Sequence, residues 1–190
     1  MDEWNIEIAK LNARLNYDRL TACLPANLVK KEDGLFEGFL KSHRSPHKKL
    51  KELYEFMDEL YAFVGKFTPC KKSCSDCCYY NVTISDVEIA HIEKAIGIKR
   101  LMTSLPKRDF HGEPCPLLKE GACVIYKARP FVCRRHVTLC KTPVWCHRDR
   151  CNTDVFPLLS FSEINKSMDL IIRESGQTKI MDIRQVFERV

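Results

Sequence analysis

Apolar residues recur at helical spacing twice in the first third of the chain. The first run predicts an amphipathic helix over about residues 2–21, and its apolar positions are Trp4, Ile8, Leu11 and Leu15. The second run begins at Pro46, a residue type favoured in the first turn of a helix, and ends at Gly65. Its apolar positions are Leu50, Leu53, Tyr54, Met57, Leu60, Tyr61 and Val64. We expect this second stripe to pack within its own domain rather than against a partner.

A capping box marks the start of a third expected helix. The sequence Ser-Asp-Val-Glu at residues 85–88 places a serine and a glutamate three residues apart, the spacing at which each side chain reaches the other's backbone N–H. Gly97 is a suitable C-terminal stop, and residues 79–84 predict a short strand before the helix. Six of the nine prolines then lie between residues 106 and 157, which predicts loops with a short turn at residues 119–121.

Helical spacing returns in the last segment, where we expect helices over residues 152–190. A first apolar run ends before Gly176 and consists of Ile164, Met168, Ile171 and Ile172. A terminal run follows and consists of Ile180, Ile183, Val186 and Phe187.

The composition places the chain among globular proteins without membrane spans. Its 190 residues, 45% of them apolar, are enough to bury one core. The longest run without Asp, Glu, Lys or Arg is ten residues, 20–29, and the next is nine residues, 77–85, whereas a membrane helix needs roughly 18 apolar residues. The first four residues, Met-Asp-Glu-Trp, are acidic where a secretory signal is basic. We therefore expect a cytoplasmic location and no membrane partner.

Eleven cysteines dominate the remaining chemistry. Residues 1–69 hold only Cys23, residues 70–151 hold ten, and residues 152–190 hold none. Disulfide frameworks are rare in reducing compartments, so we expect the ten clustered cysteines to be thiolates held by metal. We expect Cys23 to be a small buried apolar residue.

The positive charge of the chain is concentrated in the same segment. The three segments hold 11 basic and 11 acidic residues, then 15 and 8, then 5 and 6, so the net charge of +6 divides into 0, +7 and −1. Four thiolates with one Zn²⁺ add a net −2, so two such sites lower +7 to +3. We interpret the basic residues first as counter-charges to thiolates and second as a phosphate-binding face. They are Lys71, Lys72, Arg129, Arg134 and Arg135.

The cysteines form two clusters in the sequence. The first has four sulfurs within nine residues, at Cys70, Cys74, Cys77 and Cys78. Adjacent side chains of an extended chain point in opposite directions, so we expect one of the last two to face a second centre, or to be a structural thiol or half of a vicinal disulfide. In the second cluster a turn, a short strand and a helix begun by proline each present one sulfur, at Cys115, Cys123 and Cys133.

These clusters resemble the YkgJ-type cysteine-cluster proteins, a family of zinc- or iron-chelating domains named for its CxxCxxCC motif. The resemblance covers roughly residues 70–135, and its most specific parts are the Cys77-Cys78 pair and residues 123–134, which are similar to C-x-I-Y-x-x-R-P-x-x-C-R. The first gap is three residues here, where the family name has two. The resemblance implies metal chelation by Cys70, Cys74, Cys77, Cys78, Cys115, Cys123 and Cys133, and it brings no established catalytic activity with it.

Three positions near the second cluster are expected to support the ligands. Tyr126 and Arg129 match family positions and can supply hydrogen bonds and positive charge beside sulfur. Arg129 can equally be an ordinary ion-pairing surface residue. Arg134, which follows the last cysteine of the motif, is expected to assist in the same way.

Further candidate ligands follow the motif. They are Cys140, Cys146 and Cys151, with His147 favoured over the nearby His136 as an imidazole ligand. Ten cysteines fill two four-sulfur sites with two left over, so the sequence permits two metals without requiring them.

Zinc is the favoured metal, because ligands dispersed over separate loops are typical of closed structural zinc sites. Iron, or a 4Fe–4S cluster, is the alternative, since Cys-x3-Cys-x2-Cys at residues 70–77 is also the spacing of radical S-adenosylmethionine enzymes. Asp76 stands where those enzymes have an aromatic residue, and no alternation of strands and helices predicts their barrel. No nucleotide-binding or nucleophile motif occurs, so catalysis stays open.

Together these observations predict an α+β fold that is mostly α, with helices around a small, loop-rich, metal-stapled centre that contains a short strand or hairpin. We expect a single domain over residues 1–190, with a helical segment 1–69, a metal-binding core 70–151 and C-terminal helices 152–190. The expected function is cytoplasmic chelation of zinc or iron through clustered thiolates, with a metal ion as partner and any protein partner open. The alternatives are an iron–sulfur redox or catalytic protein, and a zinc-dependent nucleic-acid-binding module, which the missing C2H2 spacing disfavours.

Overall fold

The computed structural model describes residues 4–72, 74–102, 106, 108–176 and 179–190. The α-helices and 3₁₀ turns together make up 54% of the described residues, and the strands form only small two-stranded sheets, so the fold is α+β and mostly α, as predicted. The helices are α1 (Ile6–Cys23), α2 (Ala26–Asp33), α3 (Leu35–Leu40), α4 (Pro46–Val64), α5 (Asp86–Ile96), α6 (Phe131–Arg135) and α7 (Ser162–Glu174). The strands are β1 (Thr83–Ser85), β2 (Leu118–Lys119), β3 (Ala122–Cys123) and β4 (Ile180–Asp182). No helix in these residues is long and apolar enough to span a membrane.

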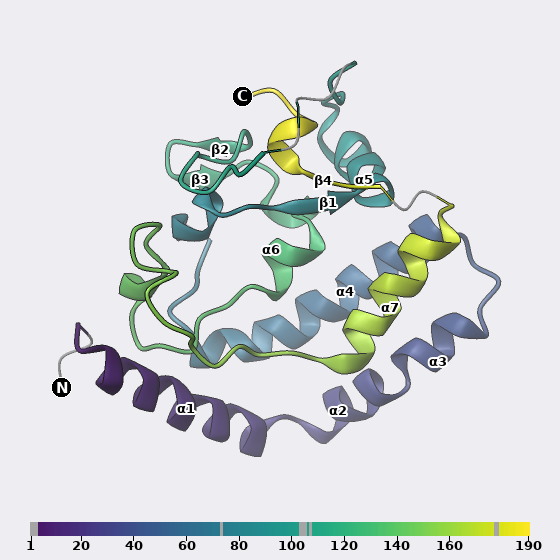
Figure 1. Cartoon of the computed structure of the whole chain (residues 1–190). Helices are drawn as coiled ribbons and strands as arrows, with labels where there is room; N and C mark the ends of the chain where they lie inside the picture. Colours follow the sequence, from purple (N-terminus) through teal and green to yellow (C-terminus); the bar gives the residue numbers. More distant parts are fainter. Residues whose placement is uncertain (1–3, 73, 103–105, 107, 177–178) are drawn as a thin grey trace.

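Helices α4 and α7 lie side by side in the centre of the fold, and α1, α2 and α3 follow one another along one edge of the molecule (Figure 1). The apolar stripe predicted for α4 is buried against α2, α3 and α7, as expected. Lys49 of α4 is only 1% exposed, and its ammonium group binds the carboxylate of Glu174 in α7 at 2.7 Å. A buried cation needs such a partner, so this pair fixes how the two helices lie against each other.

The apolar stripe predicted for the first helix is on the solvent side of α1. Trp4, Leu11 and Leu15 are each more than half exposed, whereas Ala9 and Ala13 are fully buried. Small side chains let α1 approach the cluster that contains Leu20, Val64, Leu139 and Leu159. Asn16 donates to the backbone oxygens of Phe67 and Leu139, which fixes the same face inward. The predicted helix is confirmed from residue 6 onward, and residues 2–3 lie outside the described part of the chain.

Cys23, the last residue of α1, is exposed, so the expectation that it is buried was wrong. The helix ends at the surface, and Leu24 and Pro25 lead directly into α2.

The capping box is confirmed at the start of α5. Ser85 and Glu88 make both reciprocal bonds, and Gly97 ends the helix with a φ of 73°. Glu88 is buried, and its carboxylate also accepts hydrogen bonds from the Tyr54 hydroxyl at 2.8 Å and from the backbone N–H of Phe131 at 2.7 Å. One carboxylate therefore joins α5 to α4 and to the helix that carries Cys133.

The C-terminal segment differs from the prediction. Residues 180–182 form β4, which pairs antiparallel with β1, and residues 183–185 form a 3₁₀ turn instead of a second helix. The strand predicted at residues 79–84 is also shorter than expected. The chain forms a 3₁₀ turn as far as Tyr79, and β1 begins only at Thr83. The turn at residues 119–121 is the tip of the β2–β3 hairpin, where Glu120 and Gly121 both have positive φ, as a two-residue hairpin loop requires.

Candidate metal centre

The adjacent cysteines Cys77 and Cys78 lie on the 3₁₀ turn of residues 76–79. The backbone N–H of Cys115 donates to the carbonyl oxygen of Cys78 at 2.7 Å, and Gly112 N–H donates to that of Tyr79 at 2.8 Å. These bonds join the loop of residues 110–115 to the turn. Two cysteines that are 37 residues apart are thereby fixed beside each other.

Two further cysteines of the family motif come from short elements elsewhere in the Cys-rich segment. Cys123 lies on β3, opposite Leu118, and Cys133 is in the middle of α6. Burial raises the pKa of the Cys133 thiol well above its ordinary value. Three neighbouring thiolates raise it further, and these are Cys77, Cys115 and Cys123. Hydrogen bonding to Cys77 and burial likewise raise the pKa of Cys78, with added effects from Cys115 and Cys123. We call Cys78, Cys115, Cys123 and Cys133 the inner group.

A second set of thiols also interacts electrostatically with Cys77. Burial raises the pKa of Cys146 to about 12, and the charges of Cys70, Cys74 and Cys77 contribute. Burial also raises the pKa of Cys74, with the charges of Cys70 and Cys77 adding to it. The 3₁₀ turn of residues 143–146 packs against the turn of residues 76–79, which accounts for this proximity. We call Cys70, Cys74 and Cys146 the outer group.

Cys77 interacts with both groups and is the thiol most disposed to ionise. The Cys78 thiol donates a hydrogen bond to it, which lowers the pKa of Cys77, and the positive charge of Arg129 lowers it further, although burial opposes both effects. Thiolate, rather than thiol, is the metal ligand. Cys77 therefore lies where a charged sulfur is best tolerated.

Arg129 presents a buried donor that lacks a partner among the described residues. Its guanidinium stacks on the ring of Tyr126 at 4.3 Å, and its Nε is buried and makes no hydrogen bond there. An unsatisfied buried donor costs about 1–3 kcal/mol. Since the charge of Arg129 lowers the pKa of Cys77 and opposes the raised pKa values of Cys123 and Cys133, a thiolate is the acceptor that this donor fits.

Arg134 has a different position. Its side chain is 3% exposed, lies over the ring of Tyr54 at 4.1 Å, and pairs with Asp58. It also donates to the carbonyl oxygen of Arg129 at 2.9 Å. Arg134 thus links the Arg129 backbone to α4, because Tyr54 and Asp58 both belong to that helix. Lys71 and Lys72 are exposed, and Arg135 donates to Asn165.

The cysteines beyond the family motif divide into different environments. Cys140 is 1% exposed and packs in the apolar cluster under α1. Cys151 lies 3.8 Å from Nε2 of His111. His147 is half-exposed, and its Nδ1 lies 3.4 Å from the carboxylate of Asp149. His136 is more deeply placed, and burial lowers its pKa. It lines a cavity of about 80 Å³ together with Cys77 and Cys133. His136 is thus the imidazole of the two that lines a cavity with cysteines of the motif, and the preference for His147 as a ligand stays a prediction.

Within the described residues, no three Cys, His, Asp or Glu side chains converge closely enough to hold a metal ion as they stand. The donor chemistry fits a thiophilic metal, and the buried Arg129 Nε, unpaired among the described residues, indicates where the negative charge of the thiolate ligands would lie. Coordination needs side-chain rotation, for which the cavity beside Cys77 and Cys133 leaves room.

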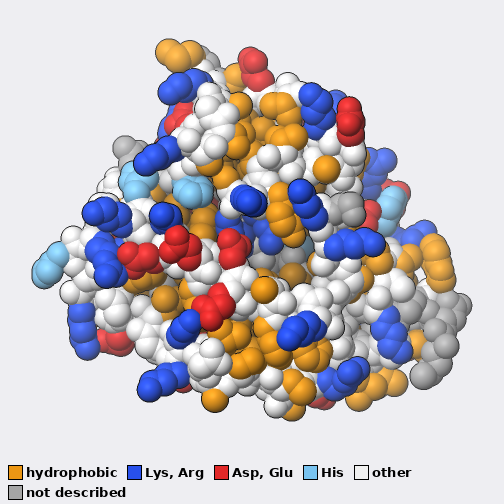
Figure 2. Space-filling view, turned by 180° about the vertical axis from the view of Figure 1, so that it is seen from behind, with side chains coloured by type: hydrophobic (Ala, Val, Ile, Leu, Met, Phe, Trp, Pro, Cys, Tyr) orange, Lys and Arg blue, Asp and Glu red, His pale blue; other side chains and the backbone are white. Residues whose placement is uncertain are grey.

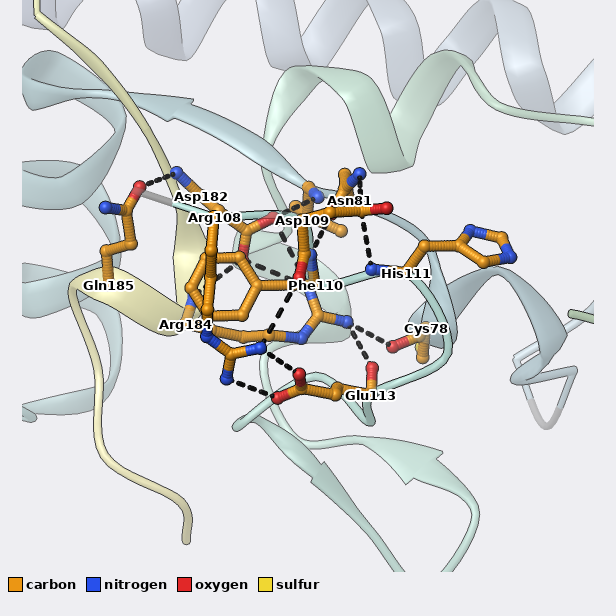
Figure 3. Close-up of polar contacts among 11 residues, drawn as sticks. Cys78, Asn81, Arg108, Asp109, Phe110, His111, Glu113, Asp182, Arg184 and Gln185 are labelled. Carbon is orange, nitrogen blue, oxygen red and sulfur yellow. Dashed lines mark hydrogen bonds and ion pairs between the residues drawn. The ribbon is translucent and has the colours of Figure 1, made fainter. Parts of the chain in front are cut away.

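Arg184 supports the site from the C-terminal segment, and nothing in the sequence pattern pointed to it. Its guanidinium donates to the carbonyl oxygens of Cys78 and Glu113 and pairs with Asp182 at 3.0 Å (Figure 3). Asp182 in turn accepts the Val82 backbone N–H at 2.7 Å. The segment after β4 therefore clamps the cysteine turn against the loop that carries Cys115.

The basic side chains on the face opposite to that of Figure 1 are spread out and mixed with acidic ones (Figure 2). This distribution is more typical of a solvated surface than of a phosphate-binding stripe.

Residues 69–152 match the family described as "CxxCxxCC: Putative zinc- or iron-chelating domain", and this span includes all ten clustered cysteines. Searches of the curated proteins and of the solved structures found no match.

Proposed function

Because residues 69–152 of this chain belong to the family of zinc- or iron-chelating CxxCxxCC domains, we propose that the protein holds metal through its inner and outer thiol groups, with Cys77 common to both. Metal binding itself follows from the family. The ligand assignment is our proposal, and it comprises Cys70, Cys74, Cys77, Cys78, Cys115, Cys123, Cys133 and Cys146.

The observation that carries this proposal is the position of Cys77. It is the thiol whose pKa is lowered, and its charge raises the pKa of members of both groups, which are Cys78, Cys133, Cys74 and Cys146. The four sulfurs of the inner group, the three of the outer group and Cys77 make eight, which are enough ligands for two four-sulfur centres. Burial is the main reason why the pKa values of these thiols are high, and repulsion between neighbouring thiolates adds to it. A bound metal cation offsets both effects, because it stabilises the ionised sulfurs.

Zinc is the metal that we propose. The ligands come from a turn, a hairpin, a short helix and a loop, and structural zinc is typically held by ligands gathered from separate short elements. We also propose a cytoplasmic location, where thiols stay reduced. The outer group contains the Cys-x3-Cys-x2-Cys spacing of residues 70–77, so an iron–sulfur cluster is the competing occupant.

Elemental analysis of protein purified anaerobically without chelator tests the proposal. We expect one or two zinc ions per chain and no acid-labile sulfide. If the analysis finds iron with an equal amount of acid-labile sulfide instead, the bound group is an iron–sulfur cluster rather than zinc, and the proposed ligands stay the same. Protein that contains no stoichiometric metal, even after anaerobic reconstitution with zinc or with iron and sulfide, would contradict chelation.

A further inference from the structure

A large cavity opens beside the outer thiol group. It has a volume of about 760 Å³ and is lined on one side by the loop of residues 151–158 and on the other by residues 136–138 and the 3₁₀ turn of residues 143–146. Cys146 and Cys151 both face it. The cavity is therefore a place from which solvent and solutes reach sulfur atoms.

The small cavity beside Cys77 and Cys133 lies directly behind the large one. Three residues line both cavities, and they are Tyr80, Asn81 and His136. These side chains form the wall between the solvent-accessible cavity and the buried thiols of the proposed centre.

Tyr80 is the central member of this wall. Its ring stacks on His111 with centroids 5.8 Å apart and meets His136 edge-on at 5.4 Å. Its hydroxyl donates a hydrogen bond to the carbonyl oxygen of Cys146. A side chain held by two ring contacts and one hydrogen bond can be displaced at modest cost, since such contacts contribute about 1 kcal/mol each.

The outer side of the wall also carries two metal-binding side chains. Nε2 of His111 is 3.8 Å from the sulfur of Cys151 and 3.0 Å from the carbonyl oxygen of Arg148. The backbone N–H of His111 donates to the carboxylate of Asp109, and its imidazole points away from Arg184 (Figure 3). An imidazole and a thiol at this separation can share one zinc ion with water as the other ligands.

We propose that this cavity is the route by which metal reaches and leaves the buried thiols: His111 and Cys151 bind the ion transiently, and the Tyr80 ring controls its passage to Cys77 and Cys133. This inference rests on the proposed function, because it concerns how the same centre is loaded. It implies that the bound metal is exchangeable, unlike that of a closed structural site.

Two measurements test the route. In the first, zinc release from the loaded protein to a chromophoric chelator is followed by stopped flow for the wild type, Tyr80→Ala and His111→Asn. We expect release at least five times faster in Tyr80→Ala, because the wall is removed, and at least five times slower in His111→Asn, because the transient ligand is lost. His147→Asn is the matched control, since His147 is outside the cavity lining, and its rate should equal that of the wild type.

The second measurement does not need metal. Alkylation of the metal-free protein by iodoacetamide, followed residue by residue by mass spectrometry, should be faster at Cys133 in Tyr80→Ala than in the wild type, with the rate at exposed Cys23 unchanged. Tyr80→Phe, which removes only the hydroxyl bond to Cys146, replaces Tyr80→Ala should the latter fail to fold, and is expected to change both rates in the same direction by a smaller factor.

The outcomes separate the two claims. Wild-type protein that binds no zinc contradicts the proposed function, and the alkylation rates then still decide whether Tyr80 closes the inner cavity. Normal zinc content with release and alkylation rates that are equal in all variants would overturn the route and leave chelation in place.

Discussion

The guanidinium of Arg184 donates a hydrogen bond from Nη2 to the carbonyl oxygen of Cys78 at 3.1 Å. These residues are 106 positions apart in the chain. The same group binds the Glu113 carbonyl and the Asp182 carboxylate. One side chain therefore connects the C-terminal turn to the two loops that supply Cys78 and Cys115.

Replacing Arg184 with lysine should destabilise the protein. A single ammonium group lacks the planar fork that reaches two carbonyls and a carboxylate, and Asp182 would remain buried with an incomplete set of partners. We expect a loss of about 2 kcal/mol in the free energy of unfolding, measured by urea denaturation of the metal-free protein. Arg189→Lys, at an exposed position nearby, is the control. Equal stability of the two variants would show that the clamp contributes nothing.

Removing the charge of Arg129 should weaken metal binding more than it weakens folding. Arg129→Met keeps a long side chain over Tyr126 but removes the positive charge and the buried donor that face the thiolates. Groups that contact metal ligands typically change affinity by about 10- to 100-fold, and we expect zinc affinity to fall within this range in competition with a chelator. Lys127→Met, an exposed change on the same turn, should leave zinc affinity at the wild-type value. Equal affinities in both variants would remove Arg129 from the site.

The metal-free protein should lose stability in alkaline solution. The pKa of Cys115 is raised to about 11 and that of Cys146 to about 12, both chiefly by burial. A thiol whose pKa is higher in the folded than in the unfolded state prefers to stay protonated in the fold. Its contribution to stability is complete below the unfolded pKa, about 9, and is lost as the pH rises through the folded pKa.

We therefore expect the free energy of unfolding of the metal-free protein to fall between about pH 9 and pH 12, by an amount on the order of 1–3 kcal/mol. Zinc-loaded protein should not show this decline, because its sulfurs are already ionised. Urea titrations at several pH values provide the measurement. A metal-free stability that stays constant or rises over this range would contradict the burial of these thiols.

Local sequence signals predicted the elements whose geometry depends on neighbouring residues. The capping box of α5, the Gly97 stop and the hairpin turn at Glu120 and Gly121 all follow from contacts within a few positions. Proline and helical spacing similarly predicted α4. The cysteine motif located the segment that matches the family.

Long-range packing decided what the sequence could not predict. The apolar period of α1 is correct, yet the inward face is chosen by Ala9, Ala13 and the bonds that Asn16 makes to residues more than 50 positions away. The last apolar run becomes β4 because β1 offers it an edge to pair with. Arg184 and His111 likewise join the site through loops that have no pattern of their own.

The number of zinc ions bound by Cys77→Ser tests the central claim most directly, since Cys77 is the thiol that both groups share. The account predicts that this variant, reconstituted anaerobically and analysed by elemental emission, loses metal from both groups and unfolds at lower urea concentration than the wild type. Cys133→Ser should lose only the metal of the inner group, and Cys23→Ser, at an exposed position, should keep the wild-type content. Wild-type zinc content and stability in Cys77→Ser would contradict the account.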